Sequence, residues 1–382
     1  MNQDDPWSVT DRDLHDTLRS LRDADATAAV ATVVGVEGSA YRRPGAKLVA
    51  PAGEDALGAI TAGCLEGPVA DLAAKARESG AVNVETFDLM DDDEWGLGLG
   101  CNGIIDVLVE PLDDSFDPVL GALADREPAA VLTVVDSADD DVPVGARTVV
   151  TRDGEASGDD RPEFPGDALA DLRDAAANAR DSGSSAALTV KRDAGDLRVF
   201  VDGVEPAPDL LLFGAQNDVH SVARVGAQAG FRVTVASPRG GRASREEFPH
   251  AHRVESTHPT DVPDLVDVDD RTYAALLSHN LVDDRLALEA LVDETDVPYV
   301  GLMGPPKRFD DLREDANAEG RTFTQNELDR VSAPVGLDLG DGSPIGIAMS
   351  IVSEVLAEAN NAEGGRLSEQ SGPIHARTDP TP

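Results

Sequence analysis

Two cysteines are the residues of this chain whose surroundings most clearly suggest chemistry. Cys64 and Cys101 both lie in glycine-rich loops, where the backbone can approach a ligand closely and its amides can point toward an anion. Thiols in that setting favour a soft ligand, such as a metal, or a sulfur-transfer partner. The alternative is that both are loop cysteines without a ligand. The glycines around them are Gly63, Gly67, Gly98 and Gly100.

A loop between residues 37 and 45 carries groups that suit an oxyanion. Arg42 and Arg43 offer two guanidinium groups, and Ser39 adds a hydroxyl. Arginine matches the oxygens of a phosphate in a bidentate manner, while Gly38 and Gly45 leave backbone amides accessible. The loop is therefore predicted to bind phosphate or another planar anion, although two surface arginines without a ligand would give the same pattern.

The second half of the chain opens with an incomplete dinucleotide-binding pattern. Gly214 and Ala215 follow a short apolar strand, but Gln216 stands where a second glycine normally lets the backbone approach a pyrophosphate. Ser237 stands where an acidic residue normally binds the ribose, and Arg239 follows it. A small residue followed by arginine resembles a site for a 2′-phosphate.

His279 and Gly301 complete the candidate residues of this half. His279 follows an apolar strand, at the edge where doubly wound parallel sheets bind ligands, and Gly301 lies in a later strand. A lone histidine is more often structural than functional, but its position at the end of a strand makes both interpretations open here. NAD(P) binding in this half is one hypothesis, and the incomplete glycine pattern argues against it.

These loops need helices and strands to position them. The spacing predicts a helix after an N-cap at Ser8 or Thr10 and a buried strand over 28–34. A further helix is predicted between Glu66 and Ser79. It would place Cys64 near its N-terminus, where the helix dipole favours the thiolate.

The fold class expected from these elements is α/β in two domains. The stretch Pro206-Ala207-Pro208 predicts a linker, and the strand–helix–strand pattern after it predicts a doubly wound, Rossmann-like parallel sheet. The expected divisions are an N-terminal α+β domain over 1–205, of which 113–205 is acidic and poorly diagnostic, a Rossmann-like domain over 206–360, and a disordered tail over 361–382.

The charge of the chain excludes some partners. Among its 382 residues, 73 are Asp or Glu and 32 are Lys or Arg, which gives a formal net charge of −41. Such a charge disfavours binding to nucleic acid and to anionic membranes, and no apolar run reaches the roughly 20 residues of a membrane helix. The N-terminus lacks a secretion signal, so we expect a cytoplasmic protein. The acidity predicts a halophilic host with molar salt, which screens the repulsion.

Several motifs, in order along the chain, resemble the XdhC/CoxI family. The resemblance implies an accessory factor, or chaperone, for maturation of molybdenum hydroxylases such as xanthine or carbon monoxide dehydrogenase. Such a factor would bind the molybdenum cofactor (molybdopterin), protect it during sulfuration and pass it to the apo-enzyme. A cysteine desulfurase as a second partner and a homodimer are also implied. The motifs lie at 37–45, 63–67 and 95–101, and, in the family's C-terminal Rossmann domain, at 213–215, 278–280, 299–304 and 334–340.

The resemblance also implies roles for single residues. Cys64 is the first candidate for contact with molybdenum or its sulfur, and Cys101 is the second. Arg42 and Arg43 would hold phosphate or pterin oxygens, while Glu66 would orient the loop or hydrogen-bond the pterin. The loops contain no catalytic acid–base cluster, so we expect a binding protein more than a turnover enzyme. The alternatives are an NAD(P)-dependent oxidoreductase that uses the second half, and an interaction protein with vestigial sites.

Overall fold

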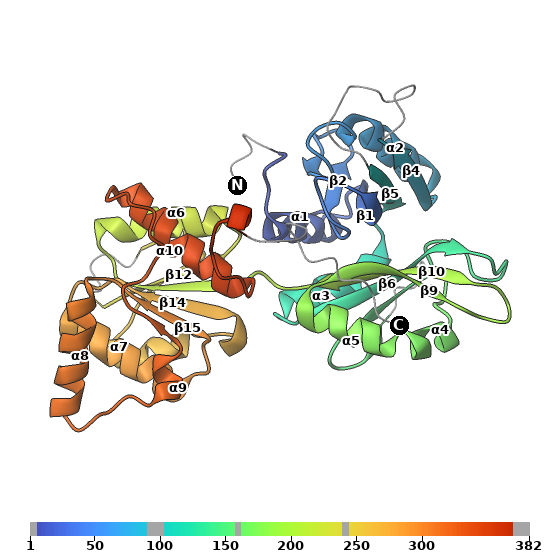
Figure 1. Ribbon diagram of the computed structural model, residues 1–382. Helices are drawn as coiled ribbons and strands as arrows, with labels where there is room; N and C mark the ends of the chain where they lie inside the picture. The colour runs from blue at the N-terminus through green and yellow to red at the C-terminus, as the bar shows by residue number, and fades with distance from the viewer. Residues whose placement is uncertain (1–5, 90–102, 157–161, 239–243, 370–382) are drawn as a thin grey trace. The chain divides into compact units, whose positions relative to one another are not determined.

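The structure is a computed structural model that describes residues 6–89, 103–156, 162–238 and 244–369. The chain divides into two compact units, with the boundary between Pro206 and Ala207. The first unit contains two five-stranded antiparallel sheets, and the second contains one six-stranded parallel sheet (Figure 1). The predicted α/β class, with an α+β first half and a Rossmann-like second half, is confirmed.

The first sheet has the strand order β3-β2-β1-β5-β4. The helix that precedes it begins after Thr10, as predicted, because the Thr10 hydroxyl and the Asp13 carboxylate form a capping box. Between β3 and β4, a second helix packs on one face of the sheet and ends at Gly80, which has a φ of 70°. The elements are α1 (Asp11–Asp23), β1 (Ala28–Gly38), β2 (Lys47–Pro51), β3 (Leu57–Gly58), α2 (Glu66–Ser79), β4 (Asn83–Asp88) and β5 (Gly103–Pro111).

The second sheet repeats this topology. Its order β8-β7-β6-β10-β9 matches that of the first sheet strand for strand, and its helices occupy the same places in the sequence of elements. The elements are η1 (Asp114–Phe116), α3 (Asp117–Ala124), β6 (Ala129–Ser137), β7 (Arg147–Val150), β8 (Glu155–Ala156), α4 (Gly166–Asp171), α5 (Arg173–Ser182), β9 (Ser185–Val190) and β10 (Leu197–Val204).

The amino-acid sequence carries the same repeat. Residues 28–34 are AAVATVV and residues 129–135 are AAVLTVV, so the central strands differ only at Ala31 and Leu132. In both copies a Gly-Ala pair followed by a basic residue opens the next strand, with Lys47 in the first and Arg147 in the second. The stretch 113–205, poorly diagnostic from sequence, is therefore a second copy of the fold of the first sheet.

The two sheets pack face to face in the first unit. Along β1, the side chains of Ala29 and Val33 face α2, whereas those of Val30 and Val34 face the other sheet. Strand β6 alternates in the same way between α5 and the shared core. Helices α2 and α5 therefore cover the two outer faces (Figure 1).

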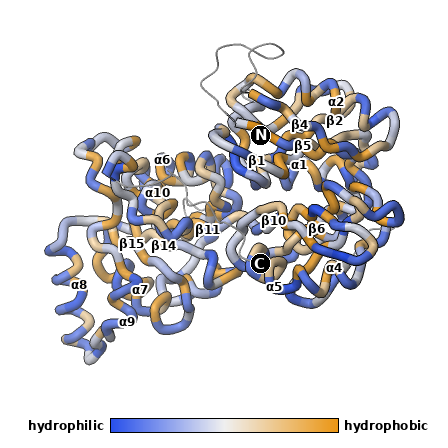
Figure 2. Tube along the Cα trace, turned by 45° about the vertical axis from the view of Figure 1, so that its right-hand side comes forward, coloured by the Kyte–Doolittle hydropathy of each residue, from blue (hydrophilic) through white to orange (hydrophobic). Residues whose placement is uncertain are grey.

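The second unit is a doubly wound sheet of order β13-β12-β11-β14-β15-β16. Helices α6 and α10 pack against one apolar cluster on one face of the sheet. Helices α7 and α8 pack against a second apolar cluster on the other face. In Figure 2 the central strands are coloured mainly as hydrophobic, while α8 is mainly hydrophilic. The elements are β11 (Asp209–Phe213), α6 (Asn217–Gln228), β12 (Arg232–Ser237), β13 (Arg253–Ser256), β14 (Thr272–Leu276), α7 (Leu281–Glu294), β15 (Tyr299–Leu302), α8 (Pro306–Ala318), α9 (Gln325–Leu328), β16 (Val331–Ser332) and α10 (Pro344–Ala359).

Two further observations concern the whole chain. Within the described residues, every helix is too short or too polar to cross a bilayer. Most of the predicted disordered tail, residues 370–382, lies outside the described residues.

Candidate functional site

The loops singled out from the sequence leave the first sheet at one end. Gly38, the last residue of β1, lies opposite Gly103, the first residue of β5. Lys47 opens β2 opposite Thr32, in the middle of β1, and Gly58, the last residue of β3, lies opposite Leu48. The arginine loop (residues 39–46), the cysteine loop (residues 59–65) and the end of β4 therefore all leave the sheet in the same direction, and Ala40 and Cys64 pack against the same apolar cluster.

The cysteine loop is held by the carboxylate of Glu66, at the first position of α2. Its Oε1 accepts a hydrogen bond from the Thr61 amide at 2.8 Å, and its Oε2 accepts one from the Thr61 hydroxyl at 2.6 Å. The Leu65 amide donates to the same Oε2 at 3.2 Å. The Glu66 carboxylate therefore closes this turn, and Cys64 lies inside it as a partly exposed free thiol.

Two glycines, one in this loop and one at the start of α2, border space that the described residues leave open. Gly63 has a φ of +109°, which a residue with a side chain rarely adopts, and a Cβ built on it would meet no described atom within 4 Å. The same is true of the space beside Gly67. A ligand could therefore approach the backbone on either side of Cys64.

Arg42 and Arg43 stand without a carboxylate partner among the residues that the structure describes. Arg43 is exposed and Arg42 is half-buried. Other arginines of the described residues are closely paired, as Arg147 is with Glu110 and Arg285 with three carboxylates, whereas the exposed Arg152 and Arg173 are in no ion pair with a described carboxylate. Two guanidinium groups that have no carboxylate partner in the described part of the chain make the arginine loop suitable for an anion.

In the second unit, the side chain of Gln216 occupies the turn predicted to bind a nucleotide. Gln216 Oε1 accepts from the Ala215 amide at 3.0 Å, and Gln216 Nε2 donates to the Ser278 carbonyl at 2.8 Å. Gly214 has a φ of +150°, and a Cβ there would lie 2.6 Å from the Leu277 carbonyl oxygen. Gly214 is therefore required by the close approach of two strands, and Gln216 uses an amide that a pyrophosphate would otherwise bind.

His279 lies at the edge of the parallel sheet, as predicted. It has a φ of +57°, and its Nε2 lies 2.7 Å from Oδ2 of Asp218. Buried Asp284 fixes the loop, since it accepts from the Ser278 hydroxyl at 2.5 Å and from Arg308 at 2.6 Å. The imidazole itself is 51% exposed and is held on the surface by one carboxylate.

The remaining predicted residues are more deeply placed or lie outside the described residues. Ser237 is fully buried at the end of β12. Gly301 lies against the segment that follows β16, because a Cβ built on it would lie 2.4 Å from a methyl carbon of Val335. Gly98, Gly100, Cys101 and Arg239 lie outside the described residues. In the described part of the chain, no group of three or more His, Cys, Asp or Glu residues is placed to hold a metal ion.

Comparison with known proteins gives matches to both units. A family model described as "XdhC and CoxI family" matches residues 21–88, and one described as "XdhC Rossmann domain" matches residues 210–355. A probable xanthine dehydrogenase subunit from Bacillus subtilis (strain 168) is 24% identical over 348 residues, covering 90% of this chain and 96% of that protein. "Uncharacterized protein YqeB" of Escherichia coli (strain K12) is 26% identical over 180 residues, covering 47% of this chain and 32% of that protein.

One solved structure shares the fold over nearly the whole chain. It is a crystal structure described as a xanthine dehydrogenase from Bacillus halodurans, with a TM-score of 0.72 and 22% identity, covering 91% of this chain and 96% of that one. At this identity the likeness shows the arrangement of helices and strands and no more.

Proposed function

Because the chain belongs to the XdhC and CoxI family, we propose that it binds the molybdenum cofactor at the loop end of the first sheet. It would then deliver the cofactor to the apo-form of a molybdenum hydroxylase of the xanthine or carbon monoxide dehydrogenase type. Its role is that of an accessory factor to that enzyme, and a cysteine desulfurase is the expected source of sulfur. The observation that carries the proposal is the pair of arginines in a loop that leaves the sheet in the same direction as the Cys64 loop, which have no carboxylate partner among the described residues.

The groups at this end fit the chemistry of the cofactor. Its phosphate matches the guanidinium groups of Arg42 and Arg43, which suit planar oxyanions. Its molybdenum is a soft centre with sulfur ligands, for which a thiolate at Cys64 is a suitable partner. A Cβ added at Gly63 or at Gly67 would meet no described atom within 4 Å, so the backbone there is open to a ligand. The cofactor supplies its chemistry to the client enzyme, and this chain binds and shields it.

The proposal is tested by uptake of cofactor released from a molybdoenzyme. Purified protein in molar salt would be incubated with the cofactor and desalted, and retained pterin would be measured by fluorescence after oxidation. The arginine loop is tested by Arg42→Ala combined with Arg43→Ala. A charge-matched control combines Arg152→Ala with Arg173→Ala, which are exposed arginines of the second copy.

The arginine-loop variant is expected to lower the affinity for the cofactor by more than about 100-fold, because it removes two bonds to a charged group, each of which contributes about 1.5–3 kcal/mol. The control should bind as the wild type does. Failure of the wild type to retain any pterin would contradict the proposal.

A further inference from the structure

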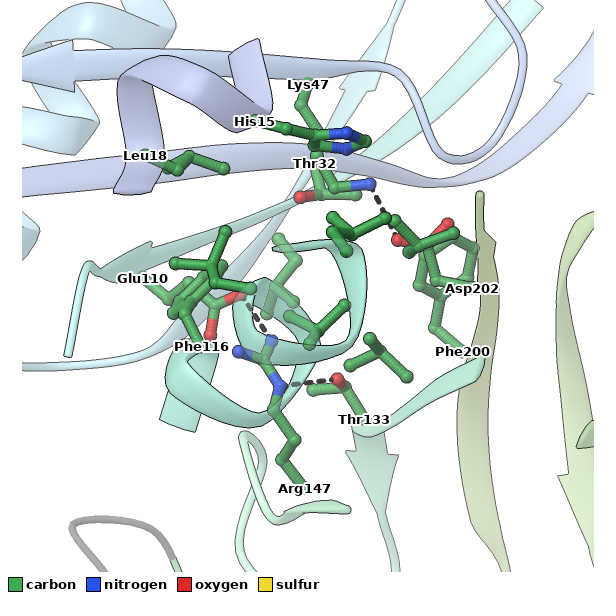
Figure 3. Close-up of a pocket in the computed structure, with 16 residues that line it drawn as sticks. His15, Leu18, Thr32, Lys47, Glu110, Phe116, Thr133, Arg147, Phe200 and Asp202 are labelled. Carbon is green, nitrogen blue, oxygen red and sulfur yellow. Dashed lines mark hydrogen bonds and ion pairs between the residues drawn. The ribbon is translucent and has the colours of Figure 1, made fainter. Parts of the chain in front are cut away.

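Two largely buried ion pairs connect the two copies in the first unit, and each pair takes one residue from each copy. Nζ of Lys47, in the first copy, lies 2.6 Å from Oδ2 of Asp202, in the second copy. In return, a terminal guanidinium nitrogen of Arg147, in the second copy, lies 2.5 Å from Oε1 of Glu110, in the first copy. Figure 3 shows the two pairs on opposite sides of one pocket, a small cavity of about 40 Å³ between the sheets.

The two pairs are equivalent by the internal repeat. Lys47 lies opposite Thr32 in the first sheet, and Arg147 lies opposite Thr133 in the second. The two carboxylates are also equivalent by the repeat, because Glu110 lies opposite a valine of β1 and Asp202 lies opposite the equivalent valine of β6. The pairs thus occupy equivalent positions in the repeat, although Lys47 and Asp202 are 17% and 8% exposed whereas Arg147 and Glu110 are 6% and 2% exposed. They also differ in what else each contacts.

Lys47 is tied to the arginine loop, which bears the charges suited to an anion. Lys47 Nζ donates to the Gly45 carbonyl at 3.0 Å as well as to Asp202. Asp202 is fixed in turn by the Ser185 hydroxyl, which donates to its Oδ1 at 2.6 Å. Gly45 has a φ of +97° and contacts these residues closely, because a Cβ built on it would be 2.9 Å from Oγ of Ser185, the residue that binds Asp202.

The corresponding loop of the second copy, residues 138–145, has the opposite character. Val142 and Pro143 stand where the first copy carries Arg42 and Arg43, since the Ala146 amide donates to the Pro143 carbonyl as the Ala46 amide donates to that of Arg43. Three aspartates, Asp139 to Asp141, precede them, and the sequence 113–205 contains no cysteine. The second copy therefore offers the same scaffold without the groups that would bind an anion.

We infer that Lys47 and Asp202 are positioning residues for the arginine loop, so that the second copy serves as the scaffold that holds the ligand-binding loop of the first. The inference rests on the proposed function for its ligand. The Arg43 carbonyl accepts from the Ala46 amide at 3.2 Å, and the Gly45 amide donates to the Val33 carbonyl at 2.8 Å. These bonds close the end of the loop where Lys47 and Asp202 also hold it. The arginines are therefore oriented before a ligand binds. Such preorganisation lowers the entropic cost of binding.

The internal repeat supplies a matched control. Lys47→Met and Asp202→Asn break the pair beneath the arginine loop, whereas Arg147→Met and Glu110→Gln break the equivalent pair beneath the acidic loop. The midpoint of thermal unfolding is expected to fall by similar amounts in the two sets. Affinity for cofactor released from a molybdoenzyme should fall about 10- to 100-fold only in the first set, by analogy with residues that support direct ligands. Ser185→Ala is a milder variant that should shift affinity in the same direction.

A second measurement needs no ligand. Amide hydrogen exchange of Gly45 and Ala46 should accelerate in Lys47→Met and in Ser185→Ala but stay unchanged in Arg147→Met. Equal losses of affinity in both sets, or no loss in either, would overturn the inference. If the wild type binds no cofactor, the proposed function fails, and unchanged exchange at Gly45 in Lys47→Met would separately overturn the positioning role.

Discussion

His15 lies in α1 at the edge of the pocket between the two sheets, close to Lys47 (Figure 3). Burial, and to a lesser extent the charge of Lys47, lower the pKa of its imidazole to about 4. Phe116 precedes its central strand by the same number of residues in the second copy, and the Arg147 guanidinium lies 4.7 Å from its ring centre. The two copies thus place different rings at one position, and only the first can titrate.

This difference predicts how stability depends on pH. An unfolded histidine takes up a proton near pH 6.5, whereas folded His15 stays neutral down to about pH 4. The free energy of unfolding should therefore fall as the pH falls between these values, by at most about 3 kcal/mol from this residue. His15→Phe, which copies Phe116, should remove that part of the loss. Chemical denaturation of both proteins at about pH 7, 5.5 and 4.5 measures it, and identical pH slopes would contradict the assignment.

Among the elements, the turn between β11 and α6 decides the expected response to nucleotides. The side chain of Gln216 occupies the Ala215 amide and bridges to the Ser278 carbonyl. We therefore expect NAD and NADP not to bind and to leave the midpoint of thermal unfolding unchanged. A nucleotide that did bind, at about 100 times its Kd, would add about 2.7 kcal/mol to the free energy of unfolding and raise the midpoint measurably. A clear upward shift with either nucleotide would instead favour the oxidoreductase hypothesis.

The elements also show how far sequence reasoning reaches. The helix starting after Thr10, the helix over Glu66–Ser79 and the parallel sheet follow from local capping and periodicity, which are visible in a short window. The second copy of the first sheet escaped that reasoning, because its loops are acidic and lack the motifs of the first. The shared AAV-x-TVV strand and the Gly-Ala-basic start of the next strand were the signal that could have revealed it.

The same limit applies to contacts distant in sequence. The hydrogen bonds of Glu66 join neighbours in the chain, and the family resemblance had implied a role for it in orienting the loop or binding the pterin. The tie from Lys47 to Asp202 joins residues from two sheets and depends on their packing. Only the register of the first sheet shows that the arginine and cysteine loops leave it in the same direction.

For the whole molecule, the net charge of −41 predicts a strong dependence on salt. At about 0.1 M salt, charges repel one another over about 10 Å, while at about 1 M that range shrinks to about 3 Å. The thermal midpoint should therefore rise with KCl over this interval, and KCl and NaCl at equal concentration should act alike if screening is the cause. A midpoint that is constant or falls with added salt would contradict this prediction.

The claim that the first sheet's loop end receives the molybdenum cofactor is tested most directly at Cys64. Wild type, Cys64→Ser and Cys101→Ser would be incubated in molar salt with cofactor released from a molybdoenzyme, and retained pterin would be measured after desalting. We predict retention by the wild type, a loss of more than about tenfold in Cys64→Ser and a smaller loss in Cys101→Ser, since the loss of a soft ligand weakens contact with the metal centre. Equal retention by wild type and Cys64→Ser, or retention by neither, would contradict the account.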